Sequence, residues 1–158
     1  MNLKEVVSVN AAAAILFFTD RILKIFFVNN PGYSRDFIVG FLHVRFLKNS
    51  GVAFGLLDSA NSYGKYFIFI VVLIFIFIVL FFLASAYKKN NKILILLFTF
   101  IAFGAVSNFF DRIRFGYVVD YIDVPFFTVF NIADMMISFS VIAIFVFEVF
   151  QSKKKEAT

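Results

Sequence analysis

The sequence predicts an all-α integral membrane protein: a bundle of four transmembrane helices with a small extracytoplasmic β-sheet between the first and second helices. Of its 158 residues, 62% are hydrophobic and 27 are phenylalanine. Only 16% are charged, whereas soluble domains usually carry about 25%. The mean hydropathy is +0.94, and the apolar residues are gathered in long segments. We expect one membrane domain, residues 1–158.

Two segments are long and apolar enough to cross a bilayer without help, since a span needs about 20 apolar residues. Residues 66–87 contain no charged side chain, and the segment 93–112 is uncharged as far as Phe110. Only the short stretch KKNNK separates these two segments. We therefore expect an antiparallel helical hairpin.

Two further segments, residues 6–28 and 130–150, are long enough to span only if they carry charges. Their charged residues are Asp20, Arg21, Lys24, Asp134 and Glu148. Ionisable residues within a span usually face the bundle interior or a water-filled cavity. The first segment is too long for a cleavable signal peptide and no small-residue cleavage site follows it, so we expect it to remain as the first span.

The basic residues predict the topology. Four spans place both termini on one side of the membrane, and that side would hold Lys4, the lysines of KKNNK and those of the C-terminal tail. Their density exceeds that of the opposite loops, which predicts cytoplasmic termini. Basic clusters that flank apolar segments are typical of membrane topology, so we expect no nucleic-acid partner.

The longest segment outside the spans, residues 31–63, mixes β-branched and aromatic residues with glycines. This composition predicts short strands joined by turns, within residues 35–57. The single histidine, His43, is expected in a loop and lacks the neighbours for a metal cluster or a catalytic triad. The chain has no cysteine, which excludes disulfides and thiolate chemistry. We expect no metal and no cofactor.

Polar residues recur at helical spacing near the outer ends of three spans. They are Asp20 and Lys24 in the first, Gly104, Asn108 and Arg112 in the third, and Asn131 and Asp134 in the fourth, with Asn49 in the outer loop. Simpler structural interpretations stand beside a functional one. Asp20 could pair with Lys24, Asp111 with its neighbour Arg112, and Asn131 or Asp134 could cap the last helix.

The segment GYVVDYIDV between the third and fourth spans contains two aspartates. If the segment is extended, its side chains alternate between two faces, so only one of Asp120 and Asp123 can point into the bundle. Periodicity does not choose between them, although a solvated Asp123 is the simpler interpretation.

The remaining chemistry is acid–base catalysis by carboxylates. Two aspartates brought together in a low-dielectric site cannot both ionise easily, so one retains a proton. The ionised group can activate a water while the protonated group polarises a carbonyl, which would hydrolyse a peptide bond. A small ion- or proton-coupled transporter using intramembrane carboxylates is the alternative, and a structural scaffold is a third. The sequence shows no inverted repeat, and its acids gather at one surface, which argues against a transporter.

Four motifs extend over nearly the whole chain: DRILK at 20–24, NSGVAFGLL at 49–57, GAVSNFFDRIRFGYVVDYIDV at 104–124 and VFNIADMMI at 129–137. With them the chain resembles the lipoprotein signal peptidase (signal peptidase II) family of bacterial inner-membrane aspartic peptidases. The resemblance implies cleavage of signal peptides from diacylglyceryl-modified prolipoproteins. It also implies a four-helix bundle with an extracytoplasmic β-cradle and a short periplasmic helix.

The resemblance places the catalytic dyad on Asp120 and Asp134. The positions that would bind substrate or support the site are Asp20, Lys24, Asn49, Gly51, Asn108, Arg112 and Asn131. The implied partners are the lipidated prolipoprotein and membrane lipid, and we expect a monomer in which Phe54 could close over the peptide. One departure is visible: VPFFTV, between the two aspartates, leaves little room for a periplasmic helix.

Overall fold

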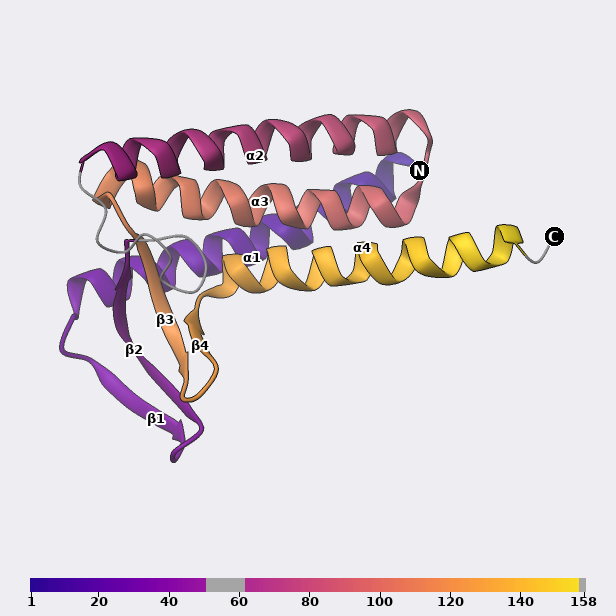
Figure 1. Ribbon diagram of the computed structural model, residues 1–158. Coiled ribbons are helices and arrows are strands. Elements are labelled where there is room, and N and C mark those ends of the chain that lie inside the picture. The colour runs from indigo at the N-terminus through magenta and orange to yellow at the C-terminus, as the bar shows by residue number, and fades with distance from the viewer. Residues whose placement is uncertain (51–61, 157–158) are drawn as a thin grey trace.

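The computed structural model describes residues 1–50 and 62–156, and within them four long helices lie side by side with a small sheet at one end (Figure 1). The helices are α1 (Leu3–Asn29), α2 (Ser62–Lys88), α3 (Lys92–Phe115) and α4 (Ile132–Glu156). By length and composition, α2, α3 and α4 are apolar enough to cross a membrane. The predominantly helical membrane fold is thus confirmed.

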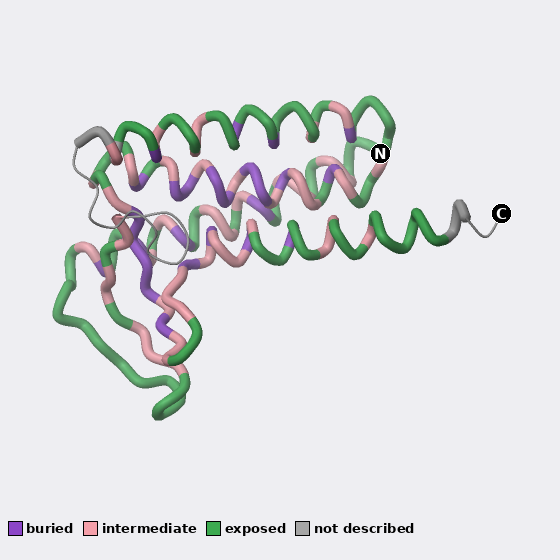
Figure 2. The backbone as a smooth tube through the Cα atoms, in the orientation of Figure 1, coloured by how far each residue is buried: buried purple, intermediate pink, exposed green. Residues whose placement is uncertain are grey.

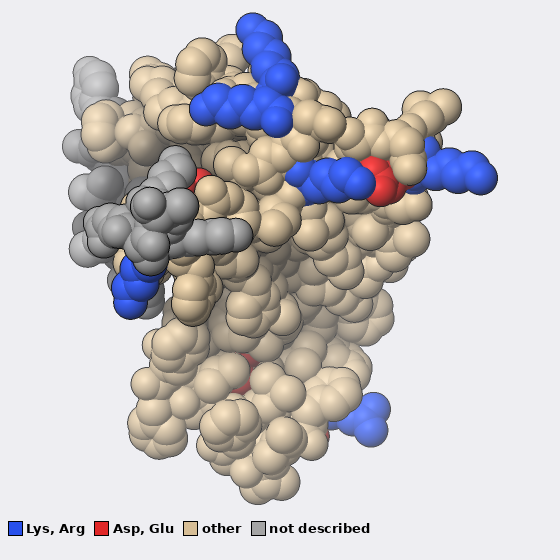
Figure 3. Space-filling view, turned by 90° about the vertical axis from the view of Figure 1, so that its right-hand side faces the viewer, with Lys and Arg blue, Asp and Glu red and all other residues tan. Residues whose placement is uncertain are grey.

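The helices α2 and α3 form the antiparallel hairpin that the sequence predicts (Figure 1). The chain N-terminus is tied to this hairpin: Lys92 Nζ lies 2.8 Å from Glu5 Oε1, and the Met1 amino group contacts Asn90. Both termini lie at the end of the bundle remote from the sheet. Figure 3 looks onto that end, where Lys and Arg side chains gather over the helix ends while the sheet below presents mostly uncharged side chains.

The sheet is antiparallel, with strand order β1-β2-β3-β4. Its strands are β1 (Ser34–Ile38), β2 (Leu42–Asn49), β3 (Val118–Val124) and β4 (Thr128–Phe130). The sequence predicts the whole sheet between the first two helices. Only β1 and β2 lie there, whereas β3 and β4 belong to the α3–α4 connection. The strand β3 pairs with β2 from His43–Asp123 to Asn49–Val118. Between the end of β3 and the start of α4, residues 125–127 form a turn and residues 128–130 form β4, with no helix.

The glycine that ends α3 directs the chain into β3. Gly116 has φ +77°, and its N–H donates to the Arg112 carbonyl at 3.1 Å. This left-handed helix ending favours glycine because a Cβ would be strained there. Two residues later β3 begins, so the polar end of α3 and the aspartates of β3 are held close together.

Buried residues follow α3 and continue into β3 (Figure 2). One apolar cluster, formed by Phe27, Val119 and Tyr121, joins α1 to β3. At Gly104 a Cβ would lie 2.6 Å from the Ala133 carbonyl oxygen. Because this distance is shorter than van der Waals contact, only glycine allows α4 to begin so close to α3.

Candidate active site

The predicted polar residues meet where β3 and the first turn of α4 pack against α3. Asp120 comes from β3 and Asp134 from α4, while Asn131 directly precedes α4. Asn49 reaches Asp120 from the end of β2. Gly51 and Phe54 lie outside the residues that the structure describes.

Asp120 faces away from the apolar cluster that its neighbours Val119 and Tyr121 form. It is 2% exposed and accepts hydrogen bonds from Asn131 Nδ2 at 2.7 Å and Asn49 Nδ2 at 3.0 Å. Burial, followed by the charge of Asp134, raises the pKa of Asp120 to about 7 despite these two hydrogen bonds. Asp120 can therefore hold a proton near neutral pH.

Asp134 is held by the cap of α4. Asp134 N donates to Asn131 Oδ1 at 2.9 Å, and Asn131 N donates back to Asp134 Oδ2 at 3.2 Å. This reciprocal pair is a capping box. The other carboxylate oxygen accepts from Asn108 Nδ2 at 2.7 Å. Capping, considered above as an alternative to a functional role, is thus the means by which this carboxylate is oriented.

The asparagines link the two carboxylates. Asn131 donates to Asp120 through its side-chain Nδ2. It contacts Asp134 through its backbone N–H and its side-chain Oδ1. Asn108 Oδ1 in turn accepts from Lys24 Nζ at 2.8 Å and lies 3.3 Å from Asn131 Nδ2. The orientation of each amide is therefore fixed by its partners.

A buried ionic cluster supports Asn108. Lys24 Nζ lies 2.8 Å from Asp20 Oδ2 and 3.0 Å from Asp111 Oδ2, and all three side chains are 0% exposed. With Asn108 as third acceptor, every ammonium proton is used. The predicted Asp20–Lys24 pair is confirmed.

The sequence interpretation missed part of this cluster. Asp111 was expected to pair locally with Arg112, but the ion pairs that the structure gives it are with Arg21 and Lys24 of α1. Asp111 further accepts from Val119 N at 3.2 Å. Ser107 Oγ donates to Asp20 Oδ2 at 2.6 Å. Ser107 and Asp111 are four residues apart, so helical spacing could have identified them as a second polar stripe beside Asn108.

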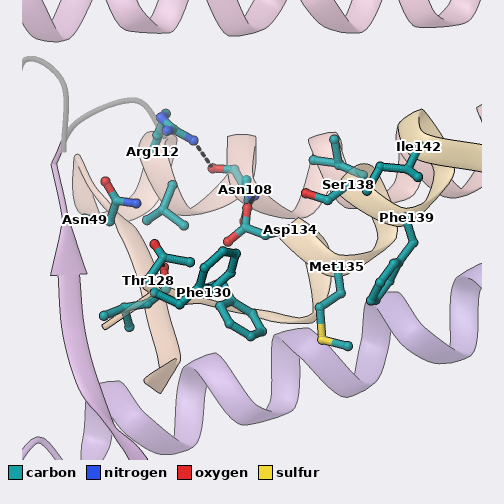
Figure 4. A pocket seen from close by; sticks show the side chains of 14 residues that line it. Asn49, Asn108, Arg112, Thr128, Phe130, Asp134, Met135, Ser138, Phe139 and Ile142 are labelled. Carbon is teal, nitrogen blue, oxygen red and sulfur yellow. Dashed lines mark hydrogen bonds between the residues drawn. The ribbon is translucent and has the colours of Figure 1, made fainter. Parts of the chain in front are cut away.

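A cavity of about 480 Å³ opens beside Asp134 (Figure 4). Its polar end is formed by Asn49, Asn108, Arg112 and Asp134, and Figure 4 shows Phe139 and Ile142 at the other end, along α4. Phe139 is 64% exposed and Ile142 59%. The cavity therefore joins a polar pocket to the apolar outer face of a membrane-spanning helix.

The second aspartate of β3 lies apart from this cavity. Asp123 was expected to be solvated, but it is 7% exposed and its Oδ2 lies 2.8 Å from Arg45 NH2. His43, expected in a loop, belongs to β2, with Nδ1 at 2.5 Å from Asp36 Oδ1. The pairing of β2 with both neighbouring strands accounts for both corrections.

The fold and the polar residues around Asp120 and Asp134 define a helical membrane protein in which two aspartates are linked by asparagines. A family model described as "Signal peptidase (SPase) II" matches residues 12–150. The lipoprotein signal peptidase of Bartonella henselae is 35% identical over 88% of this chain and 86% of its own length. That of Enterococcus faecalis is 35% identical over 77% and 74%.

The structure agrees with these matches. A solved structure titled as a bacterial membrane enzyme is similar with a TM-score of 0.81 and 26% identity, covering 98% of this chain and 93% of the other. The chain belongs to the signal peptidase II family, and it is a bacterial membrane protease of the aspartic type. Membership of a peptidase family argues against the transporter alternative.

Proposed function

We propose that the protein removes signal peptides from diacylglyceryl-modified prolipoproteins, with Asp120 and Asp134 as the catalytic dyad. The observation that carries this proposal is the linkage of both carboxylates by Asn131, with Asp134 at the polar end of the cavity. The relatives named lipoprotein signal peptidase supply the substrate class.

In the proposed reaction, Asp134 removes a proton from a water molecule, and the resulting hydroxide attacks the scissile carbonyl. Asp120, whose pKa of about 7 lets it hold a proton, donates that proton to the developing oxyanion. As the tetrahedral intermediate collapses, Asp120 recovers its proton and the departing amine takes the proton held by Asp134. Each carboxylate ends in its starting state, and no covalent intermediate is formed.

We also propose that α1 is the fourth span, with cytoplasmic termini and the sheet on the extracytoplasmic side. The helix α1 is as long as α2, and its buried charges face α3. The cavity would then open at the outer boundary of the bilayer, where the lipid chains of a substrate could lie along Phe139 and Ile142. At the tip of the sheet, the exposed side chains of Phe37, Val39 and Phe126 suit contact with membrane lipid.

The experiment that tests this proposal is cleavage by purified protein in detergent, with lipidated and unlipidated forms of one prolipoprotein side by side. We expect release of the signal peptide from the lipidated form and much slower release from the unlipidated one. Equal rates would contradict the proposal that the lipid chains of the substrate lie along Phe139 and Ile142. Cleavage of neither form would contradict the proposed activity.

A further inference from the structure

The first turn of α4 is capped partly by residues from other elements. A helix begins with backbone N–H groups that have no partner within the helix. In α4, Asp134 N donates to Asn131 Oδ1 and Met135 N to the Asn131 carbonyl. The two preceding amides, those of Ile132 and Ala133, donate to residues of β3 and α1.

Tyr121 supplies the first of these external partners. Ile132 N donates to the Tyr121 hydroxyl at 3.1 Å, and that hydroxyl donates to Asp20 Oδ1 at 2.9 Å. The ring is stacked on Phe27 with its centroid 5.3 Å away and an interplanar angle of 4°. Tyr121 is 2% exposed, so the hydroxyl is held in place by packing and by both of its hydrogen bonds.

Asp20 supplies the second external partner. Its Oδ1 accepts from Ala133 N at 3.3 Å in addition to Tyr121, while its Oδ2 accepts from Ser107 and Lys24. A carboxylate at a helix N-terminus is favoured by the helix dipole. The Asp20 carboxylate therefore connects the start of α4 to α1 and α3 at one buried point.

We propose that the Tyr121 hydroxyl is a positioning group for the reaction, which together with Asp20 holds the first turn of α4 and thereby sets the position of Asp134. Tyr121 directly follows Asp120 on β3 but points to the opposite face. One short segment thus supplies a carboxylate to the dyad and anchors the helix that supplies the other. This inference rests on the proposed dyad of Asp120 and Asp134.

The first test is Tyr121→Phe, which removes the hydroxyl and keeps the ring on Phe27. Small displacements of catalytic groups can reduce rates by up to about 10²-fold, and we expect kcat to fall about tenfold because Asp134 is no longer held in register. KM for the lipidated substrate should change less than about twofold, since Tyr121 is not one of the described residues that line the cavity. Tyr117→Phe is the matched control: it removes a tyrosine hydroxyl from the same connection, and the Tyr117 ring packs on Phe115 with Lys48 over it. Both constants should stay near wild type.

A double-mutant cycle tests whether Tyr121 acts through the amide of Ile132. Ile132→Pro removes the N–H at the first helical position, where proline is well tolerated, and Ile132→Ala controls for the lost side chain. In the wild-type background the proline variant should have a kcat several-fold below that of the alanine variant. In the Tyr121→Phe background the two should have nearly equal kcat, because the bond between them is already absent.

The possible results separate this inference from the proposed function. If the wild type does not cleave, or if Asp134→Asn is fully active, the proposed dyad is overturned. An active wild type with unchanged kcat in Tyr121→Phe, or a fall in kcat that the cycle shows to be independent of the Ile132 amide, would overturn the positioning role alone. If Tyr121→Phe does not fold, equal kcat for the proline and alanine variants would overturn it as well.

Discussion

The helix α2 and the polar centre show two ways in which this apolar chain is built. Residues 66–87 of α2 carry no charge, and many of their large side chains are exposed, Phe77 at 63% and Phe81 at 70% among them. In the centre, by contrast, Asp20, Lys24, Asp111 and Asn131 are fully buried. Where a side chain faces lipid, one apolar residue can be substituted by another with little consequence, whereas buried charges require particular partners. The difference indicates that sequence changes in α2 should be tolerated and those in the centre should not.

The largest effect is expected where the centre carries out chemistry. Asp134→Asn should lower cleavage of a lipidated substrate by about 10²–10⁴-fold, because the water loses its general base. The amide oxygen can still accept from Asn131 N, so the helix cap should be retained and the variant should remain folded. Glu148→Gln, which changes another and exposed acid of α4, should cleave at the wild-type rate. An active Asp134→Asn variant would remove Asp134 from the mechanism.

The next largest effect concerns the buried cluster. Lys24→Met should destabilise the protein by about 3–5 kcal/mol, because Asp20 and Asp111 would lose their shared cation in a buried site. Thermal unfolding in detergent measures the change. Lys92→Met is the matched control: the Lys92–Glu5 pair is exposed at 60% and 38%, and its loss should leave the unfolding temperature unchanged. Similar losses in the two variants would show that the buried cluster has no special role.

The pH dependence of the rate follows from Asp120. Its pKa is raised from 3.8 to about 7, and in the proposed role it must be protonated. The rate should therefore fall as pH rises through about 7, by about tenfold for each further unit. The raised pKa also means that the folded state binds the proton more tightly than the unfolded state, so this group's contribution to stability is complete below about pH 4 and is lost as pH rises to about 7. A rate that rises between pH 7 and 8 would contradict the assignment of Asp120 as the acid.

A smaller effect is expected where α3 and α4 touch. Gly104→Ala would place a methyl group 2.6 Å from the Ala133 carbonyl oxygen, so α4 must shift and carry Asp134 with it. We expect a several-fold loss of kcat and a destabilisation of about 1–3 kcal/mol from overpacking. Gly32→Ala, where a Cβ meets nothing within 4 Å, should change neither. An unaltered kcat in Gly104→Ala would show that this approach does not position Asp134.

The sequence was sufficient for the helices and for most of the centre, since apolar length and helical spacing are local properties. Spacing placed Asn108 beside Arg112 and Asn131 beside Asp134. It could not assign β3 to a sheet with β2, because strand pairing joins residues about 70 positions apart, as Asn49 with Val118. For the same reason the Asp123–Arg45 pair and the contacts of Asp111 with α1 were not foreseen. Nothing in the local sequence distinguishes Tyr121, and only the contacts of its hydroxyl with α1 and α4 give it a further role.

The most direct test of the central claim compares the two aspartates of β3, which alternation alone could not separate. Asp120 is linked to Asp134 through Asn131, whereas Asp123 pairs with Arg45 on the other face of the strand. Rates of signal-peptide release from a lipidated substrate should be measured for Asp120→Asn and Asp123→Asn in parallel. We predict that Asp120→Asn loses cleavage while remaining folded and that Asp123→Asn keeps a rate within about twofold of wild type, since general acid–base catalysis contributes far more than that. Substantial cleavage by Asp120→Asn, or its loss in Asp123→Asn alone, would contradict the account.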